Sequence, residues 1–176
     1  ADEIVQAGGS AEAVAFDVTD AEATQAACAR LLEAGPVQVI VNNAGTHDDA
    51  VFPAMREAQW QHVIDVSLNG FFNVTQPLML PMIRTRWGRV INISSVTFLT
   101  GQGHLVDYVS SKGGMIGFTR TLAREIGPDG ITVNAITPGA ILTEAELTMF
   151  PDQEAVAAPG REGLDGERKL VKTSLG

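Results

Sequence analysis

Apolar residues follow strand spacing and helix spacing in turn along most of this chain. Four short apolar runs predict strands: residues 14–16, 37–41, 89–93 and 131–136. Three longer stretches with apolar residues on one helical face predict helices: residues 19–32, 56–83 and 107–126. Strands that alternate with helices form a parallel sheet through right-handed crossovers, with helices on both of its faces. The pattern therefore predicts an α/β fold with a doubly wound parallel sheet.

Two of the predicted helices carry signals that refine their shape. Thr19 and Glu22 have the spacing of a capping box, which predicts a helix start at this point. Pro77 and Pro81 lie within the long stretch at 56–83. Proline lacks a backbone N–H and clashes with the preceding turn, so these two residues should kink or interrupt the second half of that helix.

The length and composition favour one globular domain. A chain of 176 residues can bury a sizeable core. A content of 45% hydrophobic and 19% charged residues excludes a disordered chain. Beyond about residue 151 the sequence turns to glycine, proline and charge without a strand pattern. We expect residues 1–150 to form the domain and residues 151–176 to form an irregular, atypical tail.

The charge balance narrows the compartment and the partners. Asp and Glu number 21 against 12 Lys and Arg, a formal charge of -9, whereas a nucleic-acid binder needs clustered cations. The single cysteine, Cys28, cannot form an internal disulfide and suits a reducing compartment. No apolar run approaches the ~18–20 residues of a membrane span, and the first residues lack a basic signal-peptide start. We expect a soluble, cytoplasmic protein that binds neither nucleic acid nor membranes.

The most informative pair of residues is Tyr108 and Lys112. They are four residues apart on a predicted helix, so they share one face. A phenol is a poor acid or base at neutral pH, and a cation held close stabilises its ionised form. Such a pair suits proton exchange with a carbonyl or alcohol oxygen, although an ordinary surface pair has the same spacing. Ser94 and Ser95 follow a predicted strand, where ligands bind in open α/β sheets.

Four ordered segments resemble motifs of the short-chain dehydrogenase/reductase family: residues 42–45 (Asn-Asn-Ala-Gly), 91–95 (Ile-Asn-Ile-Ser-Ser), 108–112 (Tyr-Val-Ser-Ser-Lys) and 138–143 (Pro-Gly-Ala-Ile-Leu-Thr). The chain is most similar to the classical branch that contains the 3-oxoacyl-[acyl-carrier-protein] reductases, and the resemblance covers roughly residues 1–145. It implies a Rossmann-like fold, an NAD or NADP cofactor, and a carbonyl, alcohol or acyl-thioester substrate. An acyl carrier protein is a further partner that it implies.

The resemblance also implies catalytic roles for matching residues. Tyr108 would exchange a proton with the substrate oxygen, and Lys112 would stabilise its phenolate and hold the nicotinamide ribose. Ser95 would hydrogen-bond the substrate oxygen; its spacing to Tyr108 fits the family better than that of Ser94. Many members carry an asparagine where this chain has Ser67, so we expect Ser67 to hold a water in a modified proton relay. Asn69 lies two residues further on and faces elsewhere on a helix.

A further set of residues would contact the cofactor: Asp17, Val18, Asn43, Ala44, Gly45, Tyr108, Lys112, Pro138, Gly139, Ile141 and Thr143. Asp17 resembles the acid that binds the adenine amino group, and the alternative is a helix-entry role, because acids are common at such turns. Asn43 could equally be structural. Ile141 and Thr143 would meet the nicotinamide carboxamide.

The chain departs from the family pattern at both ends. No Gly-x-x-x-Gly-x-Gly precedes Asp17, so the turn that binds the pyrophosphate has no counterpart. The residue that selects NAD or NADP, and the final strand, also have none. We therefore expect a Rossmann-like sheet without the first βαβ portion and the last strand, from a longer reductase. An inactive fragment that acts only by association through its helices is the alternative.

The other polar residues are open to more than one interpretation. His47, His62 and His104 lack metal-ligand spacing, and we expect no metal site. His104 could line the substrate pocket or face solvent. A local basic cluster around Trp87 could dock an acidic carrier protein or form a solvated helix end: Arg84, Arg86 and Arg89. Wide apolar stripes on the helices at 56–83 and 107–126, which pair across a dimer in the family, favour a homo-oligomer, a dimer or tetramer, or belong only to the core.

Overall fold

The computed structural model describes residues 1–139 and 141. The α-helices are α1 (Asp2–Gln6), α2 (Ala21–Leu32), α3 (Glu57–Ile64), α4 (Gly70–Arg84), α5 (Thr97–Thr100) and α6 (Val106–Ile126). The strands are β1 (Val39–Asn42), β2 (Gly88–Ile93) and β3 (Ile131–Ile136). Short 3-10 turns lie at η1 (Phe52–Ala54) and η3 (Gly127–Asp129), and η2 (Asp65–Asn69) is a π-helical segment.

The three strands form one parallel sheet in the order β1-β2-β3. The register pairs Asn42 with Asn92 and Asn92 with Ala135, so the strands end together at one edge. Each crossover carries a helix, as parallel neighbours require. The α/β class with a Rossmann-like parallel sheet, predicted from the sequence, is confirmed. The predicted strands at 89–93 and 131–136 correspond to β2 and β3, and the one at 37–41 starts two residues later as β1.

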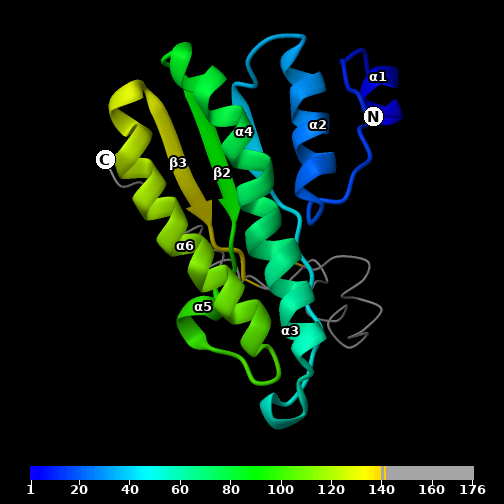
Figure 1. Cartoon of the computed structure of the whole chain (residues 1–176), viewed down its shortest axis with the longest axis vertical. Coiled ribbons are helices and arrows are strands. Elements are labelled where there is room, and N and C mark those ends of the chain that lie inside the picture. The colour runs from blue at the N-terminus through cyan, green and yellow to red at the C-terminus, as the bar shows by residue number, and fades with distance from the viewer. Residues whose placement is uncertain (140, 142–176) are drawn as a thin grey trace, which may run out of the picture.

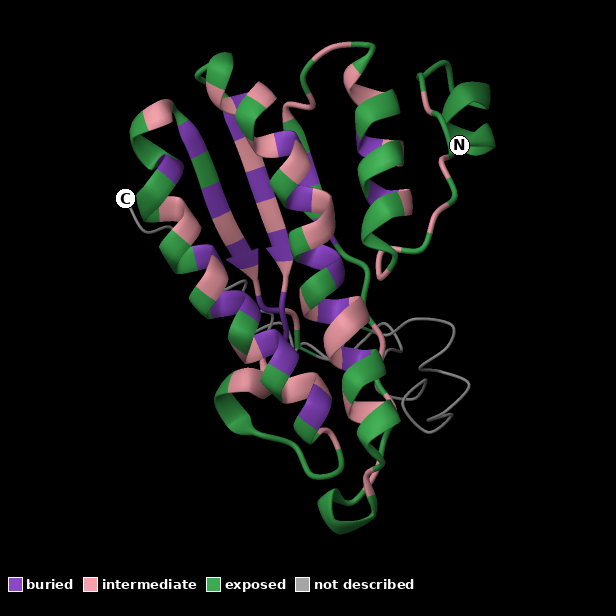
Figure 2. Cartoon of the chain, viewed as in Figure 1, coloured by how far each residue is buried: buried purple, intermediate pink, exposed green. Residues whose placement is uncertain are grey.

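Helices α4 and α6 lie across one face of this sheet, and α2 lies beside α4 (Figure 1). Alternate strand residues, among them Ile40, Val90 and Val133, are buried under these helices (Figure 2). Val39 and Val41 point to the opposite face and are 48% and 57% exposed. Among the described residues, helices therefore cover one face of the sheet, whereas the strand and helix pattern predicts cover on both.

Burial of apolar side chains between α2, α4, α6 and the sheet forms the core. Its members are Cys28, Ile40, Leu78, Met82, Val90, Ile126, Ile131 and Val133. Each fully buried aliphatic side chain contributes about 1.5–3 kcal/mol to this packing. Within the part of the chain that the structure describes, no helix combines the length and apolar character needed to cross a membrane.

Two predictions for the N-terminal part were wrong in detail. Residues 14–16 form no strand, because a strand needs a hydrogen-bonded neighbour and the described ladders join only β1, β2 and β3. The cap of α2 is Asp20, whose carboxylate accepts the Ala23 N–H at 2.9 Å, rather than Thr19. The Thr19 hydroxyl donates instead to the carboxylate of Asp17 at 2.8 Å.

The long helix predicted at 56–83 is present as α3, η2 and α4 in direct succession. Pro77 and Pro81 do not interrupt it: α4 continues through both to Arg84. The buried side chains of Leu78 and Met82, next to these prolines, offset the lost backbone hydrogen bonds. The irregularity lies at η2, and π-helical segments of this kind are frequent at functional sites.

Candidate active site

A pocket of about 280 Å³ opens where the three strands end. Two backbone hydrogen bonds join the segment that follows β2 to the end of β3 and the residues after it: Ser94 N–H donates to Ile136 O at 2.8 Å, and Val96 N–H donates to Pro138 O at 2.9 Å. The lining comes from the ends of all three strands and from α6: Asn43, Gly45, Thr46, His47, Ile93, Ser94, Ser95, Tyr108, Lys112, Pro138 and Gly139. This position, outside the carboxyl ends of parallel strands, is where open α/β sheets bind ligands.

Helix α6 brings Tyr108 and Lys112 to the pocket one turn apart. The Lys112 ammonium is 5.5 Å from the centroid of the Tyr108 ring. Its Nζ donates to the carbonyl of Ile93 at 2.8 Å, and the residue is only 4% exposed. Burial lowers the pKa of Lys112, because desolvation penalises its charged form. An ammonium has three N–H donors, so two remain for a bound molecule.

The two serines after β2 have different partners. The Ser94 hydroxyl is buried and donates to the carbonyl of Lys112 at 3.0 Å, which ties β2 to α6. The Ser95 oxygen accepts from the Thr97 hydroxyl at 2.9 Å and from its N–H at 3.3 Å. The Ser95 O–H is therefore left to donate into the pocket. This difference supports the assignment of Ser95, rather than Ser94, as the group that meets a substrate oxygen.

Ser67 lies behind the pocket, within η2, and is fully buried. Its hydroxyl oxygen accepts the Thr46 N–H at 3.3 Å and so holds the loop that follows β1. A side chain at Gly45 would come within 3.3 Å of Lys112 Nζ and 3.6 Å of Ser67 Oγ, so glycine suits this close approach. Asn69, in contrast, is exposed and bonds Asp65 at 2.6 Å. A water held by Ser67 stays a prediction.

The residues expected at the cofactor fall into two groups. Asn43, Gly45, Pro138 and Gly139 line the pocket with Tyr108 and Lys112, and Ala44 lies between two of them in the chain. Asp17, Val18 and Ile141 are outside the lining. Thr143 falls outside the described residues. For this whole set, contact with a cofactor stays a prediction.

Asp17 is engaged at the entry to α2. Its carboxylate accepts from the backbone N–H and the hydroxyl of Thr19, both at 2.8 Å, and these bonds lower the pKa of Asp17. Val18 packs on α4, where a Cβ at Gly70 would lie 2.7 Å from its side chain. The structure therefore shows Asp17 in the helix-entry role, and its contact with the adenine stays a prediction.

Two polar features of this edge were not expected from the sequence. A buried chain of hydrogen bonds runs from Thr75 through Asn42 and Asn92 to Thr119, at 2.8–3.1 Å. Its sequence signal is an asparagine at or near the end of each of two otherwise apolar strands. Asp107 is fully buried; its Oδ1 accepts the Tyr108 N–H at 2.7 Å, and its Oδ2 has no partner among the described residues.

The three histidines take separate places. His47 lines the pocket, whereas His104 and His62 are exposed and lie outside the lining. Among residues 1–139 and 141, no three metal-ligating side chains gather into a group that could hold an ion.

The fold and the position of the pocket put the chain in the Rossmann class of α/β proteins. A sequence model of the family described as short chain dehydrogenase matches residues 1–154. Nodulation protein G of Azospirillum brasilense is 43% identical over 152 residues, which cover 82% of this chain and 62% of that protein. The chain belongs to the short-chain dehydrogenase family.

Two further relatives carry enzyme names. The acetoacetyl-CoA reductase of an Acinetobacter species is 43% identical over 143 residues, 79% of this chain and 58% of that protein. The 3-oxoacyl-[acyl-carrier-protein] reductase of Escherichia coli is 34% identical over 149 residues, 84% of this chain and 61% of that protein. The chain thus spans about three fifths of the length of these relatives.

Proposed function

We propose that the protein is a nicotinamide-dependent oxidoreductase that interconverts a ketone and a secondary alcohol, with a 3-oxoacyl thioester as its substrate. One observation carries this proposal: Ser95, Tyr108 and Lys112 line a single pocket at the carboxyl edge of the sheet. The names of two relatives, an acetoacetyl-CoA reductase and a 3-oxoacyl-[acyl-carrier-protein] reductase, support a thioester.

Each of the three side chains has one task in this reaction. The Tyr108 hydroxyl gives its proton to the substrate oxygen, and Tyr108 lines the pocket. The Ser95 O–H donates to the same oxygen and stabilises the charge that develops on it. The Lys112 ammonium, 5.5 Å from the ring, stabilises the phenolate left behind. Because the pocket holds the substrate beside these groups, the reaction becomes effectively unimolecular, which lowers its entropic barrier.

The described residues fit the nicotinamide half of the cofactor. Gly45 leaves room beside Lys112 that a Cβ would fill, and Lys112 keeps two donors for ribose hydroxyls. Pro138 and Gly139 also line the pocket. When bound, the nicotinamide supplies the hydride, and the chain supplies orientation and proton exchange. NAD and NADP are both compatible with these residues, so the cofactor is NAD or NADP.

The basic cluster of Arg84, Arg86 and Arg89 supports a structural role better than a docking role. Arg86 donates to Pro128 O at 3.0 Å and lies 3.6 Å from the Asp129 carboxylate, and the Arg89 guanidinium stacks over Trp87 at 4.7 Å. The cluster lies at the start of β2. The pocket is at the end of that six-residue strand, about 20 Å away at 3.3 Å per residue.

Association of copies is a second part of the proposal. Phe72 and Leu80, eight residues apart on α4, are 52% and 57% exposed and share a helix face. This apolar face supports a homo-oligomer. It also favours the alternative function, a chain that acts only through association. Sedimentation of the protein and of Phe72→Ser, combined with a turnover assay, separates the two: a dimer without turnover would support the alternative.

The test of the proposal begins with the purified protein and its two possible cofactors. Titration of NADH and NADPH separately, followed by reduced-nicotinamide fluorescence, gives the cofactor preference. Oxidation of the preferred reduced cofactor is then measured with acetoacetyl-CoA as the substrate. We expect Ser95→Ala to lose turnover roughly 100-fold or more, as for an oxyanion donor. Each substitution should lower stability by about 0.5–1.5 kcal/mol, because Ser95 and Ser94 both lose hydrogen bonds within the protein. Ser94→Ala should not show the large loss of turnover. Equal losses of turnover in both variants would contradict the assigned roles.

A further inference from the structure

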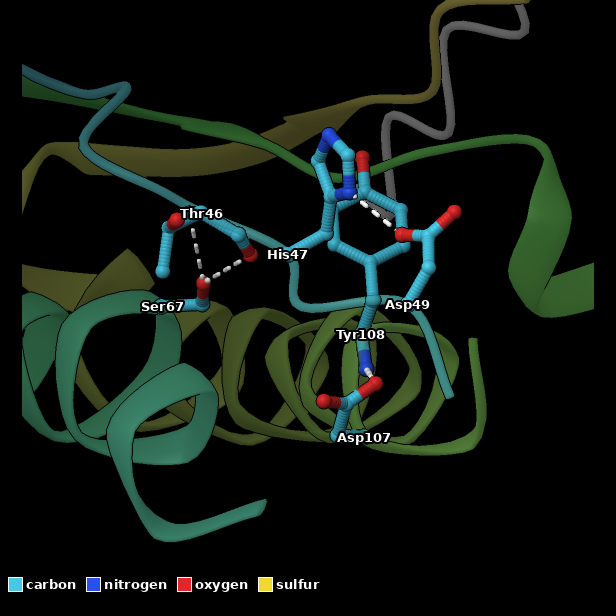
Figure 3. Close-up of polar contacts among 6 residues, drawn as sticks. All are labelled: Thr46, His47, Asp49, Ser67, Asp107 and Tyr108. Atoms are coloured by element: carbon cyan, nitrogen blue, oxygen red, sulfur yellow. Dashed lines mark hydrogen bonds and ion pairs between the residues drawn. The ribbon is translucent and has the colours of Figure 1, made fainter. Parts of the chain in front are cut away.

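A histidine–aspartate pair that the reaction above does not use lies against Tyr108. The His47 and Tyr108 rings meet edge to face, with centroids 6.2 Å apart at 79° (Figure 3). His47 Nδ1 is 2.6 Å from Asp49 Oδ1. His47 also lines the pocket with Ser95 and Lys112. The imidazole is thus a wall of the site, next to the phenol whose hydroxyl does the proposed chemistry.

The loop that carries His47 is fixed on both sides of it. Before His47, the Thr46 N–H donates to Ser67 Oγ at 3.3 Å (Figure 3). After it, the Ala50 N–H donates to His104 O at 3.0 Å, in the loop that leads into α6. These two bonds tie the loop to η2 and to the segment before Tyr108. The two bonds therefore hold the backbone from which the imidazole reaches the phenol.

The Asp49 carboxylate decides which nitrogen of His47 is available. Because Nδ1 is used by the carboxylate, Nε2 is the nitrogen left to exchange a proton with another group. The two side chains are 56% and 57% exposed, so water reaches both.

Of the three ionisable side chains described in the pocket lining, His47 is the one open to water. Lys112 is buried and donates to a backbone carbonyl, and Tyr108 is half-buried. Two other carboxyl groups lie next to these residues in the chain. Asp48 follows His47 in the same loop and is half-buried. Asp107 precedes Tyr108 and is fully buried, and one of its carboxylate oxygens accepts a hydrogen bond from the Tyr108 N–H. His47 is therefore the ionisable side chain of the lining that is most accessible to solvent.

We propose that His47, oriented by Asp49, returns the proton that Tyr108 gives to the substrate. This inference rests on the proposed reductase function. With a bound reduced nicotinamide as the source of hydride for the carbonyl carbon, the Tyr108 O–H proton would pass to the carbonyl oxygen and a phenolate would remain on Tyr108. The imidazolium of His47 then gives its Nε2 proton to the phenolate oxygen, directly or through one water. The neutral imidazole takes a proton from solvent, which balances the cycle.

His47 thus acts through Tyr108, and the test needs a readout that packing alone would not change. Turnover of acetoacetyl-CoA with the preferred reduced nicotinamide is measured for the protein and for His47→Gln, Asp49→Asn and His104→Asn. We expect His47→Gln to lower kcat about tenfold or more with KM within about twofold, and added imidazole to restore kcat saturably. Asp49→Asn should lose less, because the imidazole is still present.

His104→Asn is the matched control. Its side chain is exposed and outside the pocket, and its backbone φ of 71° is one that asparagine tolerates. Its carbonyl, which holds Ala50, is unchanged by the substitution, so turnover should be unchanged.

Three results would overturn the inference, and they differ from one another. An unaltered kcat in His47→Gln would remove His47 from the proton path while leaving the reductase function intact. A loss of kcat in His47→Gln that imidazole does not restore would mean that the ring serves only to pack against Tyr108. No turnover by the unsubstituted protein, with either nicotinamide, would contradict the proposed function itself.

Discussion

The two ends of the sheet differ in the kind of side chain that they bury. At the carboxyl end, buried polar groups such as Asn92, Ser94 and Lys112 each have a hydrogen-bond partner. At the amino end the charged side chain of Arg86 is exposed, and the buried contacts are apolar and steric: a Cβ at Gly88 would lie 2.1 Å from Met82 Sδ. Buried polar groups are costly unless they are paired, so their concentration at the carboxyl end supports the proposed site there. The other end closes the core.

The contrast predicts that changes at the carboxyl end affect turnover, and the largest effect is expected for Tyr108→Phe. Phenylalanine keeps the ring and its contact with His47 but cannot donate a proton. We expect kcat to fall by roughly 10²–10⁴-fold, the range for loss of a general acid. The melting temperature, measured on the same preparation, should stay the same. A variant that retains more than half of the turnover would contradict the role of Tyr108.

Lys112→Met should have the second largest effect, through loss of the charge beside the phenol. We expect turnover to fall roughly 100-fold or more. The substitution also predicts a change in pH dependence. Burial lowers the pKa of Lys112 from 10.5, so between its folded pKa and 10.5 the unfolded chain binds more protons. This lysine therefore makes the free energy of unfolding rise with pH in that window.

Urea unfolding at a series of alkaline pH values tests the second part. The difference in free energy of unfolding, unsubstituted protein minus Lys112→Met, should grow with pH. Burial raises the pKa of the Cys28 thiol from 9.0, which makes stability fall as pH rises. Cys28 is present in both proteins, so its contribution cancels in the difference. A difference that is flat with pH would show that Lys112 is not desolvated.

At the amino end, Gly88→Ala should lower stability without touching the chemistry. The added methyl group would collide with Met82, which is fully buried. We expect a loss of about 1–3 kcal/mol in the free energy of unfolding, as for other overpacked cores. Gly117→Ala, within α6, is the control. A Cβ at Gly117 would meet nothing within 4 Å, so this substitution should raise the free energy of unfolding by about 0.5–1 kcal/mol. Equal effects of the two substitutions would refute the steric account.

The smallest effect is expected for Arg86→Ala. The ion pair of Arg86 with Asp129 spans 3.6 Å between side chains that are 69% and 35% exposed, so its loss should cost no more than about 1 kcal/mol. Turnover with an acyl-carrier-protein substrate should not change. A marked rise in KM for that substrate alone would instead support docking of the carrier at the cluster of Arg84, Arg86 and Arg89.

The sequence predicted well those elements whose pattern is local. Strands β2 and β3 and helix α6 follow directly from their apolar spacing and their flanking glycines. The strand predicted at 14–16 failed because strand formation depends on a partner elsewhere in the chain. The choice of Asp20 over Thr19 as the cap depended on which side chain reaches the Ala23 N–H. Neither the partner of a strand nor the side chain that reaches the Ala23 N–H can be determined from the neighbouring residues alone.

The same limit applies to the site. The spacing of Tyr108 and Lys112 predicts that they share one helix face, and both residues line the pocket. The sequence around His47 fits no metal site and indicates no other role for this residue. Its contact with Tyr108 depends on the two tethers of its loop, which join segments about 20 and 50 residues apart. Such long-range contacts leave no signal in the residues next to His47.

The most direct test of the account follows the hydride. The protein is incubated with acetoacetyl-CoA and a reduced nicotinamide that carries two deuterium atoms at its reactive carbon. The account predicts one deuterium at C3 of the 3-hydroxybutanoyl product, and no such product from Tyr108→Phe at comparable times. Product without deuterium, or the same labelled product in equal yield from Tyr108→Phe, would contradict a hydride-transfer site in which Tyr108 supplies the proton.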